Sequence, residues 1–273
     1  MSYDEIAEGY AQHWGPVIRP AAERVLDLAT PVIAAGLTAG REPHVLDVGA
    51  GTGTLAIRAL ELWPALQVTA IDPSGGMLEL ARRHAAERLP MAVRRRLHTE
   101  VAPADEMPFE DGAVDVAVSS FVLQLVASRA AAMREVRRVL RPGGLFAWVA
   151  WQHTNRVYEP DRVANDVLDD AGFDPPEGEG PSGDIASPAA AAAGMRKAGF
   201  RDVTAVTDEM AHAWTPADYL AFFTQFDEES LFADLEPDER VEIEGKISQG
   251  LARLSREQMT LRLPVIYVTG RAP

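Results

Sequence analysis

Short apolar runs alternate with longer amphipathic segments through the middle of the chain. Runs of five or six residues rich in apolar side chains predict buried strands, at 44–48, 67–71, 97–101, 114–118 and 145–150. Between them, apolar residues spaced three or four positions apart predict helices, at 54–63, 76–89 and 130–140. Because strands that alternate with helices pair in parallel, this order predicts an α/β sheet with helices on both faces.

The rest of the chain predicts mainly helices and two further strands. Residues 1–40 have a helical apolar stripe, in which Thr30 and Pro31 are typical of a helix restart. Residues 173–186 are rich in Pro, Gly and acids and predict a loop. Further helices are expected at 157–172 and after Ser187, Thr215 and Glu236, and strands at 201–210 and 264–270.

Together these elements predict a single domain built on seven strands, mostly parallel, with the last strand antiparallel. The core is expected at about 41–153, 187–212 and 262–273, and a helical lid and cap at about 1–40, 156–186 and 214–261. Open α/β sheets bind ligands beyond the carboxyl ends of their strands. The lid and cap are therefore expected to lie over that edge of the sheet.

The first predicted strand runs into a glycine turn with the sequence Val45-Leu46-Asp47-Val48-Gly49-Ala50-Gly51-Thr52-Gly53. Glycine permits positive φ values and lets backbone N–H groups approach a ligand closely. The spacing is G-x-G-x-G, whereas a dinucleotide fingerprint reads G-x-G-x-x-G. Asp47, two residues before the first glycine, suits a ligand with an ammonium group, such as S-adenosylmethionine (SAM). The alternative is an ordinary tight strand–helix turn.

A second acid, Asp72, ends the second predicted strand. In nucleotide-binding α/β folds an acid at this place accepts hydrogen bonds from ribose hydroxyl groups. The alternative is an exposed turn acid beside Pro73. The coincidence of Asp72 with the glycine turn favours the functional interpretation.

Three downstream segments complete a resemblance to a known family. They are Ile71–Leu78, Met107–Gly112 and Arg134–Gly144. Over about 45–150 the chain resembles the class I SAM-dependent methyltransferases, in particular the group that includes the ubiquinone/menaquinone C-methyltransferases. The resemblance implies a Rossmann-like fold, SAM as the donor and S-adenosylhomocysteine (SAH) as the product. It says little about the acceptor.

The resemblance also implies a place for each matching residue around the donor. The expected contacts are Asp47, Gly49 and Gly51 at the methionine moiety, Asp72 at the ribose, Met77 and the backbone of Ala104 at the adenine, and Ser119 and Ser120 beside the sulfonium. Further donor contacts are expected from Ala50, Gly53, Pro73 and Asp105. The chain departs from the family at Pro103, where relatives usually carry an acid that accepts from the adenine amino group. Either Asp105 takes this contact over, or it is lost at a cost of about 0.5–1.5 kcal/mol.

The candidate catalytic side chains are histidines. Alignment of acceptor and methyl group can supply much of the rate, and a general base helps only a poor nucleophile. Leu123-Gln124-Leu125 stands where relatives often have histidines, so an imidazole base is absent there. The possible bases are His13, His98, His153 and His212, with surface or packing roles as the alternative. His13 and His153 are preferred because both are expected near the carboxyl edge of the sheet.

Two sets of aromatic residues each have two possible roles. Tyr10 and Trp14, with Tyr3, either form a lid over SAM or pack within the N-terminal helix. Three phenylalanines of the cap either line an acceptor pocket or form the core of the cap, namely Phe222, Phe223 and Phe226.

The composition of the chain limits which classes of molecule it is expected to bind and in which compartment it is expected to act. The net charge of −15 works against binding a nucleic-acid backbone. Cysteine is absent, and no dense cluster with metal-ligand spacing is visible. The absence of a long apolar run and of a secretory signal pattern predicts a cytoplasmic protein without a membrane partner.

The sequence thus predicts a SAM-dependent methyltransferase that acts by direct in-line transfer on a small, partly apolar acceptor. Another SAM-using enzyme on the same fold and a non-catalytic SAM-binding protein remain as alternatives. A nucleotide-dependent oxidoreductase is disfavoured by the glycine spacing. The acceptor, the atom that is methylated, the general base and the oligomeric state are left open.

Overall fold

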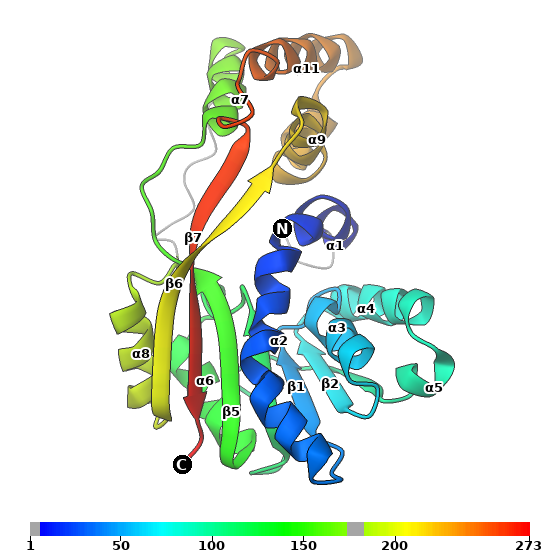
Figure 1. The fold of residues 1–273 in the computed structure, drawn as a ribbon. Coiled ribbons are helices and arrows are strands. Elements are labelled where there is room, and N and C mark those ends of the chain that lie inside the picture. The colour runs from blue at the N-terminus through cyan, green and yellow to red at the C-terminus, as the bar shows by residue number, and fades with distance from the viewer. Residues whose placement is uncertain (1–5, 174–182) are drawn as a thin grey trace.

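A computed structural model describes residues 6–173 and 183–273 of the protein. Seven strands form one sheet in the order β3-β2-β1-β4-β5-β7-β6 (Figure 1). Their bounds are β1 His44–Val48, β2 Gln67–Asp72, β3 Leu97–Val101, β4 Val114–Ser120, β5 Leu140–Trp151, β6 Arg201–Ala213 and β7 Thr260–Arg271. The first five strands pair in parallel, and β7 runs antiparallel to β5 and β6. The predicted mixed sheet with an antiparallel last strand is confirmed.

Helices cover both faces of this sheet and build a cap beyond it. Their bounds are α1 Ala7–Gly9, η1 Tyr10–Trp14, α2 Gly15–Thr38, α3 Thr54–Leu62, α4 Gly75–Arg88, α5 Met91–Arg94, α6 Arg129–Val139, α7 Glu159–Asp170, α8 Pro188–Lys197, α9 Pro216–Phe222, η2 Phe223–Asp227, α10 Glu229–Asp234 and α11 Pro237–Leu251. The segments η1 and η2 are single π-helical stretches. Within the described residues no helix is both long and apolar enough to cross a membrane.

Alternating side chains of β5 show how the two cores form. Leu145, Ala147 and Val149 join the core that includes α2 and α3. Phe146 and Trp148 point to the opposite face and join the core that includes α6 and α8. Because successive side chains of a strand face opposite sides of a sheet, burial of both faces requires a continuous apolar run. This explains the pattern from which the strands were predicted.

The long helix α2 differs from the prediction in two respects. It continues through Pro31 without a restart, and Thr30 lies inside it, with its hydroxyl donating to the Leu26 carbonyl at 2.9 Å. Val25, Leu26 and Ala29 are fully buried in the core on one face of the sheet. The apolar stripe therefore holds the helix together across the proline, and α2 packs on the sheet and not over the strand ends. The short α1 and η1 precede it.

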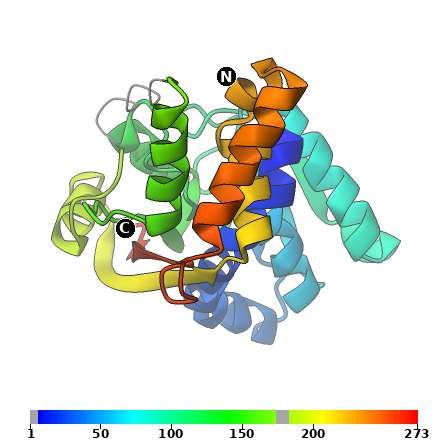
Figure 2. The ribbon, with the colours of Figure 1, turned by 90° about the horizontal axis from the view of Figure 1, so that it is seen from above.

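The cap stands on a two-stranded ribbon. Strands β6 and β7 are longer than predicted, and their pairing continues to Ala213 and Thr260, well past the end of the sheet (Figure 1). The helices α7, α9, η2, α10 and α11 lie at the far end of this ribbon. Seen from above, α7 and α11 lie next to each other across the cap (Figure 2). Ser187 and Thr215 accept hydrogen bonds from backbone N–H groups of α8 and α9, so both predicted N-caps are confirmed.

Candidate functional site

The carboxyl ends of three neighbouring strands bring most of the predicted donor residues together. The glycine turn follows β1, Asp72 ends β2, and Ser119 and Ser120 end β4, and these strands are adjacent in the order β2-β1-β4. Ala104 and Asp105 follow β3, the next strand outward. The sheet thus aligns segments that are far apart in the sequence along one edge.

The backbone of the glycine turn is left-handed at its key positions. Gly49 has φ +69°, and a Cβ atom there would lie 2.4 Å from Cγ2 of Val122. Gly51 has φ +53°, and a Cβ atom there would meet no protein atom within 4 Å. Both positions favour glycine because other residues are strained at positive φ. Gly49 is packed against the protein, whereas Gly51 borders open space that a ligand can enter.

Asp47 is buried beneath this turn. Its side chain is 1% exposed, and Oδ2 accepts a hydrogen bond from the Ala56 N–H at 3.0 Å. Burial raises the pKa of Asp47 to about 7, and the nearby charge of Asp72 adds to the effect. A positive charge above the turn would reverse this shift, because it favours the ionised carboxylate.

Asp72 fixes the turn to the start of α4. Its Oδ2 accepts from the Gly51 N–H and its Oδ1 from the Ser74 N–H, both at 2.9 Å. Ser74 in turn caps α4, its hydroxyl accepting from the Met77 N–H at 3.0 Å. The carboxylate thus orients two backbone segments that border the open space, in addition to its predicted role at a ribose. Pro73 is exposed beside it, and the Ala50 N–H donates to the β2 backbone.

The predicted adenine end lies against the N-terminal segment. Met77 and Leu80 of α4 form a small buried cluster with Ala7, against which Tyr10 packs. Ala104 is buried, whereas Pro103 and Asp105 are exposed. The N-terminal helices therefore cover α4 at the place where the resemblance puts the adenine.

The two serines at the end of β4 differ in environment. Ser119 is 1% exposed and donates to the Val48 carbonyl at 2.8 Å, which ties β4 to β1. Ser120 is half-buried. The next residue, Phe121, has φ +57°, although it is not a glycine. Such strain costs of the order of 1–3 kcal/mol and is common at functional sites. Its ring centroid lies 4.1 Å from that of Trp151 at the end of β5.

Aromatic rings connect this edge of the sheet with η1 and the cap. We call them the aromatic seam, which consists of Tyr10, Trp14, Phe121, Trp151, Phe222 and Phe226. Trp14 of η1 lies 6.1 Å from Trp151 and 5.4 Å from Phe222, measured between ring centroids. Tyr10 lies 6.3 Å from Phe226. The two π-helical segments η1 and η2 therefore contact each other. In Figure 1 the N-terminal segment that begins with α1 lies between the sheet and α9 of the cap.

The two histidine candidates lie on different elements, and their role as a base stays a prediction. His13 is half-buried on η1, and His153 is exposed after β5. Among the residues that the structure describes, neither imidazole has a hydrogen-bond partner. No group of three or more potential ligands in this part of the chain could hold a metal ion.

Residues 45–144 match the family model described as a methyltransferase domain. This segment contains the glycine turn, Asp72 and the strand ends described above. This part of the chain is therefore similar to a methyltransferase domain. The match ends within β5 and leaves the cap outside it.

Relatives of known name match the same region. The chain is 35% identical over 135 residues to a malonyl-[acyl-carrier protein] O-methyltransferase of Geobacter sulfurreducens, over 50% of this chain and 46% of the relative. It is 35% identical over 102 residues to the ubiquinone/menaquinone biosynthesis C-methyltransferase UbiE of Geotalea daltonii, over 37% and 42% of the two chains. The chain thus matches less than half of the length of either relative.

Solved structures share the fold over most of the chain. The YcgJ protein of Bacillus subtilis superposes with a TM-score of 0.55 at 19% identity, over 84% of this chain and 92% of that one. The [4+2]-cyclase SpnF superposes with a TM-score of 0.51 at 22% identity, over 85% and 75%. Since one of these neighbours is named a cyclase, the fold of a methyltransferase domain does not by itself define the reaction.

Proposed function

We propose that the protein transfers the methyl group of SAM directly to a small-molecule acceptor. The observation that carries the proposal is the left-handed glycine turn, held by Asp72 at the carboxyl end of β1 and open at Gly51. This turn lies within the segment that matches a methyltransferase domain. The named relatives are methyltransferases as well.

The residues around the turn suit the chemical groups of SAM. The ammonium of its methionine end would favour the ionised form of Asp47, whose pKa burial raises to about 7. Ribose hydroxyl groups would donate to Asp72. Met77 and the backbone of Ala104 would lie at the adenine, and Asp105 is the acid nearest in sequence to the missing contact at Pro103.

Methyl transfer then depends mainly on alignment. When bound, SAM supplies an electrophilic methyl group on its sulfonium. The acceptor approaches from the side of the cap, and the aromatic seam excludes water from this space. In the transfer, a lone pair of the acceptor forms the new bond to carbon while the pair of the S–CH₃ bond returns to sulfur. An acceptor that must lose a proton would pass it to water or to His13 or His153.

Calorimetric titration of SAH into the purified protein tests the donor site. We expect micromolar binding, a loss of at least about tenfold in Asp72→Ala, and no change in Glu87→Gln, an exposed acid on α4. The variant Asp72→Asn, which keeps one acceptor oxygen, and a thermal melt of each variant separate loss of the site from loss of the fold. Binding of NAD in place of SAH, or equal SAH binding by Asp72→Ala, would contradict the proposal.

A further inference from the structure

One polar side chain at the carboxyl edge of the sheet has a buried atom without a partner. Within the described residues, three buried side-chain nitrogen or oxygen atoms form no hydrogen bond, namely Oε1 of Gln124 and Nε of Arg137 and Arg141. Arg137 lies in the last turn of α6 and Arg141 at the amino end of β5. Gln124 instead follows the carboxyl end of β4, shortly after Ser120. Its carboxamide oxygen therefore lies on the side of the sheet where the donor is proposed to bind.

The loop after β4, which carries this oxygen, is fixed to the neighbouring elements. The Phe121 N–H donates to the Val149 carbonyl of β5, and the Leu125 N–H donates to the Val122 carbonyl within the loop, both at 2.8 Å. The side chain of Val122 packs against Gly49 of the glycine turn. The loop is thus held between the turn that borders the proposed donor site and the end of β5.

Arg129 and Gly183 close the other side of this loop. Nε of Arg129 donates to the Leu123 carbonyl at 2.9 Å, and its Nη2 donates to the Gly183 carbonyl. A Cβ atom at Gly183 would overlap the backbone carbonyl of Gln124, so the two segments are in direct contact. Arg129 therefore holds the backbone on both sides of this contact, and Oε1 of Gln124 stays without a donor from the described residues.

A buried carbonyl oxygen without a hydrogen bond is unfavourable, because it has lost its contacts with water. Native proteins satisfy the great majority of such groups, and an exception calls for a physical explanation. At a binding site, a ligand that brings its own hydrogen-bond donor supplies that explanation. The polar groups of SAM are proposed to bind at Asp47, at Asp72 and at the adenine contacts. The methyl acceptor is therefore the molecule that is left to donate to Gln124.

We propose that Gln124 selects the acceptor, with its Oε1 accepting a hydrogen bond from an O–H or N–H group of that molecule. The inference rests on the proposed function, because it places the acceptor at the carboxyl end of β4. Phe121 and Trp151 lie beside the same loop, with 4.1 Å between their ring centroids, and aromatic faces suit a flat apolar part of the acceptor. A site that is built around a hydrogen bond discriminates strongly against analogues that lack the donor group. Molecules of the same shape without an O–H or N–H group should therefore bind weakly.

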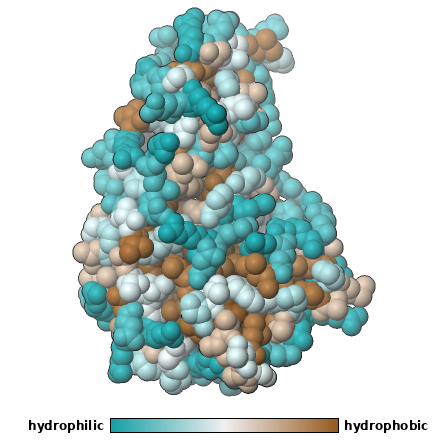
Figure 3. Space-filling model, in the orientation of Figure 1, coloured by the Kyte–Doolittle hydropathy of each residue, from teal (hydrophilic) through white to brown (hydrophobic). Residues whose placement is uncertain are grey.

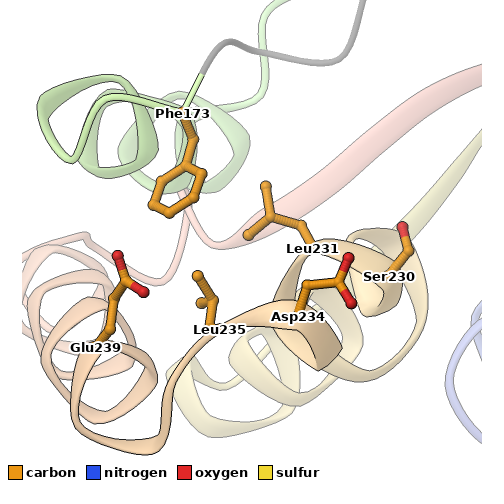
Figure 4. Close-up of a pocket in the computed structure, with 6 residues that line it drawn as sticks. All are labelled: Phe173, Ser230, Leu231, Asp234, Leu235 and Glu239. Carbon is orange, nitrogen blue, oxygen red and sulfur yellow. The ribbon is translucent and has the colours of Figure 1, made fainter.

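A hollow in the cap provides a control site for this assignment. The surface of the cap is mostly hydrophilic, whereas apolar residues gather on the part around the sheet (Figure 3). The cap hollow has a volume of about 440 Å³ between the end of α7, α10 and α11, with an apolar floor and a polar rim (Figure 4). Its lining residues are Phe173, Ser230, Leu231, Asp234, Leu235 and Glu239. Because the Ser230 hydroxyl can also accept a hydrogen bond, Ser230→Ala tests whether a probe binds in the cap hollow.

The test compares probes of similar shape with and without a donor group, namely 4-methylphenol with 4-methylanisole and indole with 1-methylindole. Each is titrated by calorimetry into the full chain saturated with SAH. We expect at least one donor probe to bind at least about tenfold more tightly than its methylated partner. Gln124→Met, which nearly keeps the shape of the side chain but removes the oxygen, abolishes this difference, and Gln124→Glu, which keeps an acceptor oxygen, retains it. The controls Gln249→Met, at an exposed glutamine of α11, and Ser230→Ala leave it unchanged.

Thermal melts of the same variants separate this role from a structural one. Because Oε1 of Gln124 has no hydrogen bond to lose, Gln124→Met should melt no lower than Gln249→Met. A clearly lower melting temperature would show that the carboxamide stabilises the fold through a protein partner, and the inference would fail.

Three binding results would also overturn the inference: binding of none of the probes, equal binding within both pairs, and discrimination that Ser230→Ala removes in place of Gln124→Met. Because SAH binding is measured first in every variant, these outcomes leave the proposed function standing. Failure of SAH to bind the wild-type protein would instead contradict the proposed function, on which the inference depends.

Discussion

Replacement of Gly51 by alanine separates the fold from donor binding. At φ +53° an alanine is strained by about 1–2 kcal/mol, and its methyl group meets no protein atom within 4 Å. The loss in the free energy of unfolding should therefore stay near that value. The methyl group would nevertheless project into the space assigned to SAM, and we expect SAH affinity to fall at least tenfold, equivalent to about 1.4 kcal/mol.

Gly40→Ala is the matched control for this substitution. Gly40 has φ +71° and likewise no protein atom near the position of a Cβ, but it lies in the exposed turn after α2. Urea unfolding should give the two variants similar stabilities, and calorimetry should show SAH binding unchanged in Gly40→Ala. If Gly51→Ala bound SAH as the wild type does, the open space at Gly51 would not be the donor site, and the reasoning would fail.

Three further predictions follow from single side chains. Burial raises the pKa of Asp47 to about 7, so ionising this carboxyl group costs free energy in the folded state, and stability falls as the pH rises from about 4 to 7. Asp47→Asn removes this cost. Urea titrations at several pH values should show the unfolding free energy of the variant, relative to wild type, increasing by up to about 4 kcal/mol over that window. Ser119→Ala removes a buried hydrogen bond to the Val48 carbonyl and should cost about 1 kcal/mol in the free energy of unfolding. A large loss of SAH affinity in the same variant would support the predicted contact of Ser119 at the sulfonium. Trp14→Ala removes the ring that lies between Trp151 and the cap, and stopped-flow fluorescence should show faster dissociation of SAH. An unchanged dissociation rate would exclude a lid role for Trp14.

Local signals explain why much of the fold could be predicted. The strands were found because burial on both faces demands apolar runs, and the caps at Ser187 and Thr215 because a hydroxyl at a helix start satisfies a backbone N–H. The glycine turn was found because its positive φ values favour glycine at Gly49 and Gly51. In each case the cause lies within a few residues of the signal.

Features that depend on distant packing were missed. The continuity of α2 across Pro31 is decided by its buried face against the sheet. Nothing in the sequence marks Phe121 for a positive φ, since its conformation is set by the strand end and the contact with Trp151. The hydrogen bond from the Tyr219 hydroxyl to Asp161 forms only when α9 and α7 meet in the cap. The contacts of the cap, where the acceptor is proposed to bind, therefore have no local signal in the sequence. The donor site has such a signal in its glycine turn.

Hydrogen–deuterium exchange with and without SAH tests the central claim most directly. If the donor lies in the space bordered by the glycine turn, SAH should slow exchange at 49–53 and 72–78 and leave the outer strand segment 201–208 unchanged. Peptides that include Ala104 should be protected as well, at the predicted adenine contact. Protection confined to the cap hollow of Figure 4, or none at the glycine turn under saturating SAH, would contradict the account.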